Sequence, residues 1–151
     1  MRILVDTNVL VRSVERAHPF MRIARNSLRH LYEEAHELCV TPQNVSEFWN
    51  VCTRPLKMNG LGNGISATDR LASRIESFFT ILPDSIETFR RWRELVVAHE
   101  VKGAKVHDAR LVAAMMVHQI NAILTFNPSD FARFSEIKIL VPAQFWPPQS
   151  P

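Results

Sequence analysis

Four acidic residues adjoin apolar segments of the kind that form buried strands and helices. Asp6 directly follows the apolar residues 3–5, Glu47 lies in PQNVSEFWNV, Asp108 lies in HDARLVAAM, and Asp130 ends the polar run after ILTF. A charged carboxylate beside a buried strand is costly unless something compensates for its lost solvation. Each of these side chains therefore either satisfies nearby backbone groups or faces a positive charge.

Each acid also has an interpretation that needs no chemistry. Asp6 can cap the helix that follows it, and Asp108 can complement a helix dipole. Glu47 can face water while its neighbours pack, and Asp130 can belong to a turn. If several acids converge, however, their charges repel and raise one another's pKa. A divalent cation would relieve that repulsion.

The hydrophobic pattern predicts where these acids lie in the fold. Short apolar segments alternate with amphipathic ones, which indicates an α/β protein with a parallel sheet. We expect one domain over 1–151, with a long loop at 56–68 and an extended, proline-rich tail at 142–151. Thr41 followed by Pro42, Ser66 with Asp69, and Asp84 with Glu87 mark expected helix starts. The expected strands are 2–5, 38–40, 81–82, 121–126 and 137–141, and the expected helices are 19–36, 42–53, 66–79, 84–99 and 108–119.

The carboxyl ends of parallel strands meet at one edge of a sheet, where ligands bind. Glu47 and Asp108 can reach this edge from the starts of their helices. Carboxylate, amide and hydroxyl oxygens suit Mg²⁺ or Mn²⁺, whereas the scattered histidines do not indicate zinc. Nucleotide-binding glycine loops are absent from the sequence. The side chains expected at the edge are those of Asp6, Thr7, Asn8, Thr125, Asn127 and Asp130.

Composition limits the class of protein. The 151 residues are 46% apolar and 22% charged, with a formal charge of +3, values typical of a globular protein with a slight preference for anionic partners. No apolar run is long enough for a membrane span, and the first residues lack the layout of a signal peptide. Cys39 and Cys52 form no CxxC motif and are expected to be reduced thiols, so we expect a cytoplasmic protein.

Four segments, LVDTNVL, PQNVSEFWNV, HDARLVAAM and ILTFNPSDF, resemble in order the motifs of the PIN-domain family. The resemblance is greatest to VapC-like toxin ribonucleases of bacterial toxin–antitoxin pairs. It implies a three-layer α/β/α sandwich with a central parallel sheet of four to five strands. It also implies a ribonuclease dependent on Mg²⁺ or Mn²⁺, inhibited by a cognate antitoxin and forming a homodimer.

The resemblance also implies roles for particular residues. Asp6, Glu47 and Asp108 match the first three acids of the family as metal ligands and catalytic groups. Family members often have Asp where this chain has Asn127, so Asp130 is the candidate for the fourth acid. Thr7, Asn8, Thr125 and Asn127 would position the carboxylates or the phosphate. The candidate cations for the RNA backbone, which ordinary surface charge would also explain, are Arg54, Lys57, Lys102, Lys105 and Arg110.

Three other functions remain compatible with the sequence. One is a PIN nuclease that processes RNA without an antitoxin. Another is a non-catalytic module of the same fold that binds RNA or a protein. The third is a phospho-receiver domain, for which Asp84 is the nearest candidate acceptor.

Overall fold

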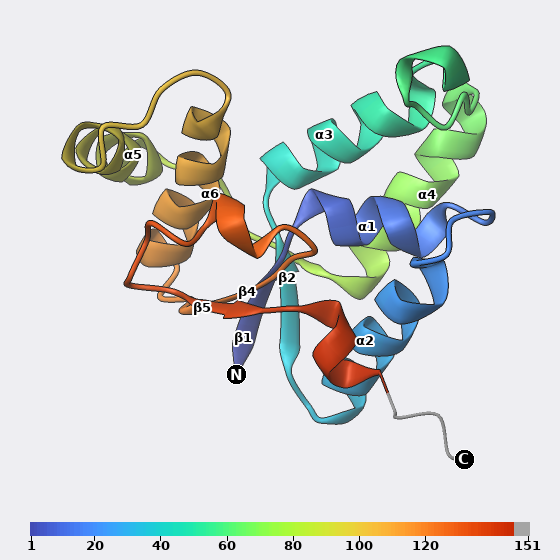
Figure 1. Ribbon diagram of the computed structural model, residues 1–151, viewed down its shortest axis with the longest axis horizontal. Helices are drawn as coiled ribbons and strands as arrows, with labels where there is room; N and C mark the ends of the chain where they lie inside the picture. The colour runs from blue at the N-terminus through green and yellow to red at the C-terminus, as the bar shows by residue number, and fades with distance from the viewer. Residues whose placement is uncertain (147–151) are drawn as a thin grey trace.

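The central element is a parallel β-sheet in the order β3-β2-β1-β4-β5 (Figure 1). The computed structural model describes residues 1–146. Leu4 in the central strand β1 is in register with Cys39 of β2 and Ile123 of β4. The strands are β1 (Arg2–Val5), β2 (Glu37–Val40), β3 (Thr80–Ile81), β4 (Ala122–Leu124) and β5 (Lys138–Leu140).

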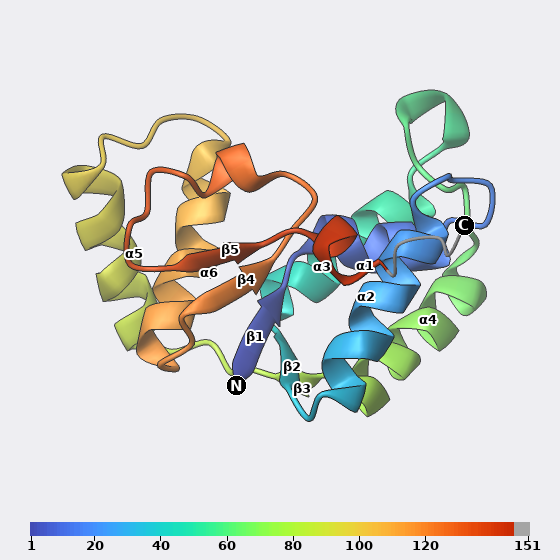
Figure 2. The ribbon, with the colours of Figure 1, turned by 60° about the horizontal axis from the view of Figure 1, so that its bottom comes forward.

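Helices cover both faces of this sheet (Figure 2). Successive side chains of a strand point to opposite faces, so Ile3 and Val5 pack into one apolar cluster and Leu4 into another. The first cluster includes residues of α1 (Thr7–Val14), α2 (Met21–Glu33), α3 (Pro42–Thr53) and α4 (Ile65–Phe78). The second includes residues of α5 (Ile86–Ala98) and α6 (Lys105–Val117). The expected three-layer α/β/α sandwich is confirmed.

All five expected strands and all five expected helices form, with shifted ends. The shifts have local causes. Helix α4 begins after Gly64, and the side chain of Ser66 accepts a hydrogen bond from Arg70, so the predicted capping box with Asp69 is wrong. Helix α5 is capped by Ser85, whose Oγ accepts from the Thr88 N–H at 3.2 Å, so the predicted start at Asp84 is wrong by one residue.

Two further segments differ from expectation. Helix α1 falls in a stretch for which the sequence pattern predicted no element, although the capping interpretation of Asp6 required one. Pro142–Phe145 forms a short 3₁₀ turn against α2 rather than an extended tail; its Gln144 side chain accepts from the Val141 N–H at 3.1 Å. Residues 147–151 of the predicted tail lie outside the described part of the chain.

Cys39 on β2 and Cys52 on α3 are buried free thiols. Burial raises the pKa of both, that of Cys52 to about 11.

Among residues 1–146, none of the helices is long and apolar enough to cross a membrane.

Helix α3 is held to the sheet by Phe48, a fully buried side chain of the first apolar cluster. We expect Phe48→Ala to lower the free energy of unfolding by about 3–5 kcal/mol, since it removes a buried ring and leaves a cavity. Urea denaturation followed by circular dichroism measures the change. The exposed neighbour Asn50, replaced by Ala, serves as the control and should change stability by less than about 0.5 kcal/mol. Equal effects of the two substitutions would contradict this account of the core.

Candidate active site

The carboxylate of Asp6 lies at the point where the order of strands along the sheet reverses. From β1 the chain proceeds through β2 and β3 in one direction, and β4 and β5 lie in the other. Ligands of open α/β sheets bind outside the strand ends at such a point. Asp6 is only 8% exposed, its N–H donates to the Leu124 carbonyl at 3.0 Å, and its Oδ1 accepts from the Thr7 N–H at 2.7 Å. Asp6 therefore caps α1 from the end of β1.

The second oxygen of Asp6 joins the ends of β1 and β4. Oδ2 accepts from the Thr125 hydroxyl at 2.7 Å and from the Asn8 amide at 2.9 Å. The Thr125 oxygen in turn accepts from the Asn8 amide at 3.1 Å and from the Asn127 N–H at 3.0 Å. The side-chain Oδ1 of Asn8 accepts from the Phe126 N–H at 3.1 Å. Thr125 and Asn8 therefore hydrogen-bond to the Asp6 carboxylate, whereas the exposed Asn127 contributes through its backbone.

Glu47 is held on α3 by a second set of side chains. Its Oε2 accepts from the Thr7 hydroxyl at 2.9 Å, and its Oε1 accepts from the Gln43 amide at 2.8 Å. The Asn44 amide donates to the Thr7 oxygen at 3.1 Å. Thr7 thereby connects Glu47 to the helix that Asp6 caps, and Glu47 does not simply face water. Sequence reasoning missed Gln43 and Asn44, although Gln43 stands one helical turn before Glu47, where an amide can reach a carboxylate.

Asp108 reaches the same region from the first turn of α6. The Gln43 amide donates to the His107 carbonyl at 2.9 Å, which joins α3 to the start of α6. Asp130 lies in the short turn Pro128–Asp130 after β4 and pairs with Lys105, whose Nζ also lies 3.8 Å from Asp108 Oδ2. Asp108 therefore stands between Glu47 and the pair of Lys105 and Asp130.

The pKa values report how these charges act on one another. The pKa of Asp6 is raised to about 6, mainly by burial; the charges of Asp108 and Glu47 act in the same direction, and hydrogen bonds from Thr125 and Thr7 act against it. Burial also raises the pKa of Asp108, with the charges of Asp130 and Glu47 in the same direction. The site thus disfavours its own ionised carboxylates, and added positive charge would stabilise them.

The donor set suits a hard divalent cation. Carboxylate oxygens surrounded by a hydroxyl and amides are the ligands that Mg²⁺ and Mn²⁺ prefer. Within residues 1–146, no three acidic, histidine or cysteine side chains stand as a preformed metal site. The charges of Asp108 and Glu47 nevertheless act on Asp6, and the three carboxylates would have to move closer together to share an ion.

The five candidate RNA-binding cations do not gather in one place. Arg110 lies at the site: its guanidinium donates to Gln43 at 3.3 Å and to Asp84 at 2.9 Å, and it lines a cavity of about 350 Å³ between α5 and α6. Lys105 lies at Asp130, and Lys102 is exposed in the loop before α6. Arg54 and Lys57 lie beyond the opposite end of α3.

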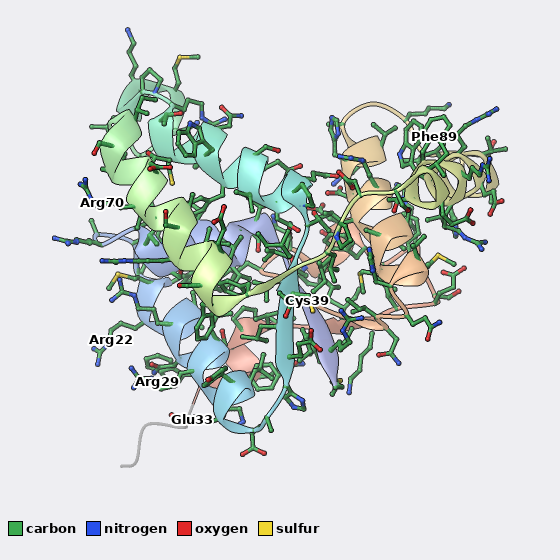
Figure 3. All side chains as sticks on the ribbon, turned by 180° about the vertical axis from the view of Figure 1, so that it is seen from behind. Arg22, Arg29, Glu33, Cys39, Arg70 and Phe89 are labelled. Atoms are coloured by element: carbon green, nitrogen blue, oxygen red, sulfur yellow. The ribbon has the colours of Figure 1, made fainter. Side chains whose placement is uncertain are left out.

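Other arginines face away from this region. Arg22 and Arg29 of α2 and Arg70 of α4 project on the side of the molecule opposite Phe89 of α5 (Figure 3). Of the five candidate cations, Lys105 contacts Asp108 and Asp130 directly, and Arg110 reaches the site through Gln43; both lie on α6.

Comparisons with known proteins agree with this geometry. VapBC2 from Rickettsia felis, solved with a promoter DNA fragment, superposes with a TM-score of 0.71 at 14% identity, covering 93% of this chain and 98% of that one. VapBC-1 from nontypeable Haemophilus influenzae gives 0.68 at 10% identity, covering 95% and 99%. VapC20 from Mycobacterium tuberculosis, described as a Sarcin-Ricin loop cleaving toxin, gives 0.66 at 16% identity, covering 87% and 95%. At these identities the likeness shows the fold alone.

No curated protein shows a significant match to the sequence. The sequence model of the PIN domain, by contrast, matches residues 3–137. That match runs from within β1 to beyond the turn Pro128–Asp130 and includes all four acids of the site. The chain therefore belongs to the PIN domain family.

Proposed function

We propose that this protein is a divalent-metal-dependent endoribonuclease, the toxin of a toxin–antitoxin pair. The observation that carries the proposal is the convergence of Asp6, Glu47 and Asp108 at the switch point of the sheet, with the pKa of Asp6 raised to about 6. Perturbed carboxylates gathered at a ligand-binding edge are typical of active sites. Membership of the PIN family and the VapBC neighbours support the choice of reaction.

Asp6, Glu47 and Asp108 would hold the ion, and Asp130 would add charge beside them. A bound Mg²⁺ or Mn²⁺ supplies activation of water and neutralises negative charge on the scissile phosphate. The chain's own residues hold the ligands still: Thr125 and Asn8 orient Asp6, and Thr7 and Gln43 orient Glu47. Such supporting hydrogen bonds fix the ligand oxygens in place.

Arg110 and Lys105 would attract the RNA backbone to this edge. Arg110 lies two hydrogen bonds from Glu47, through Gln43, so a phosphate near its guanidinium would be close to the acids. The partners proposed are a single-stranded or looped RNA, a cognate antitoxin, as in the complexes of the VapBC neighbours, and a second copy of the chain. A cytoplasmic location follows from that activity.

The first prediction about the proposed function concerns activity. We expect Asp6→Asn and Asp108→Asn to lower divalent-dependent RNA cleavage at least about 100-fold, because a lost anionic ligand removes several kcal/mol of charge stabilisation. Total cellular RNA incubated with Mg²⁺, with Mn²⁺ or with EDTA, followed by sequencing of fragment ends, measures the change. Asp69→Asn, on the exposed face of α4, is the matched control and should cleave like wild type.

Folded wild-type protein that cleaves no RNA in any of these conditions would overturn the ribonuclease assignment and favour a binding module of the same fold. Cleavage that EDTA leaves intact would overturn the role of the metal. Cleavage by a chain that no antitoxin inhibits would favour a PIN nuclease of RNA processing.

The second prediction concerns stability and follows from the pKa of Asp6. Its folded value, about 6, exceeds the ordinary 3.8, so the folded state binds the proton more tightly. The cost of ionising Asp6 in the fold is absent below about pH 4 and complete above about pH 6 to 7. Between pH 4 and pH 8, metal-free wild type should therefore lose about 3 kcal/mol of stability relative to Asp6→Asn. Urea unfolding in EDTA measures this difference.

Adding Mg²⁺ at pH 8 should raise the melting temperature of wild type and leave that of Asp6→Asn nearly unchanged. If the free energy of unfolding of the two proteins changed with pH in the same way, Asp6 would not be buried as described.

A further inference from the structure

Lys105 occupies an unusual position for a lysine. It is the first residue of α6, where the helix dipole disfavours a positive charge. A solvent-exposed ion pair contributes little stability, and the Lys105 side chain is 47% exposed. Since neither helix formation nor stability explains a lysine here, its charge is better understood through the groups that it faces.

Those groups are two acids of the site. The Nζ of Lys105 donates to Asp130 Oδ1 and lies 3.8 Å from Asp108 Oδ2. Two nearby carboxylates favour the ordinary charged form of the Lys105 amine. An ammonium ion thus stands between two carboxylates from different elements, the first turn of α6 and the turn after β4.

The four acids divide around Asp108. Glu47 accepts a hydrogen bond from Thr7, the residue next to Asp6, whereas Asp108 and Asp130 both face the Lys105 amine. One side of the site therefore holds Asp6 and Glu47, and the other holds Asp130 and Lys105. On that second side Asn127 is exposed and carries a neutral amide.

We infer that Lys105 is a built-in second cation, which fills the Asp130 side of the site and restricts this chain to one divalent ion, held by Asp6, Glu47 and Asp108. This inference rests on the proposed function. A second divalent ion bridging Asp108 and Asp130 would have to take the place of the Lys105 amine, since two cations a few ångströms apart repel strongly. Lys105 is then a positioning residue: it neutralises Asp130 and holds a positive charge beside Asp108.

Counting bound Mn²⁺ tests the inference without RNA or turnover. Electron paramagnetic resonance of free Mn²⁺, combined with calorimetric titration, gives the number of ions bound per chain. Wild type should bind one. Lys105→Met, of similar length but uncharged, should bind two. Its affinity for the second ion should be at least about tenfold higher than the affinity of wild type for a second ion. Lys105→Arg keeps the charge and should bind one.

Two further variants locate the ions. The double variant Lys105→Met with Asp130→Asn should return to one ion, which places the additional ion at Asp130. Asp6→Asn should lose the ion that wild type binds. Circular dichroism and melting temperature confirm that each variant is folded. In cleavage assays, the dependence of the rate on Mn²⁺ concentration should become steeper in Lys105→Met than in wild type.

Two bound ions in wild type, or one ion in Lys105→Met, would overturn the inference while leaving the metal-dependent function intact. No bound Mn²⁺ in wild type would overturn both the inference and the proposed function.

Discussion

The site depends on one costly feature, a carboxylate buried at the end of the central strand. Asp6 is 8% exposed, and burial is the main reason why its pKa rises to about 6. Three donors, the Thr7 N–H, the Thr125 hydroxyl and the Asn8 amide, compensate in part. These donors also fix α1 to β1 and β1 to β4. The groups that make the buried charge tolerable are therefore the groups that shape this edge of the sheet, as is common at functional sites that conflict with stability.

Much of this arrangement could be predicted from the sequence because it depends on local patterns. A strand buried on both faces is a continuous apolar run, as in residues 3–5, and its end is marked by the first polar residue. Thr41 with Pro42 is a local signal for a helix start, and α3 begins at Pro42. Once strands and helices alternate, parallel pairing brings Asp6 and Thr125 to one edge without further information.

The remainder depends on contacts between distant residues. Helix α1 is short, and its cap serves the site as well as the helix. Gln43 could not be identified because its amide connects Glu47 on its own helix to the His107 carbonyl, 64 residues away. The pairing of Lys105 with Asp130 joins two elements whose spacing carries no signal. Ser66 and Asp69 had the sequence of a capping box, yet Gly64 supplies the cap position and Ser66 lies inside the helix.

Asp6 and Thr125, which share a hydrogen bond, are 119 residues apart in the sequence. This separation has a consequence for biosynthesis. A ribosome produces β1 well before β4, and pairing between distant segments forms slowly. Asp6 has no Thr125 hydroxyl, and Asp108 has no Asp130, until the segment after β4 has emerged. Asp6 and Glu47 are therefore synthesised long before the site around them is complete. The proposed active site is in this way assembled only after β4 has been translated.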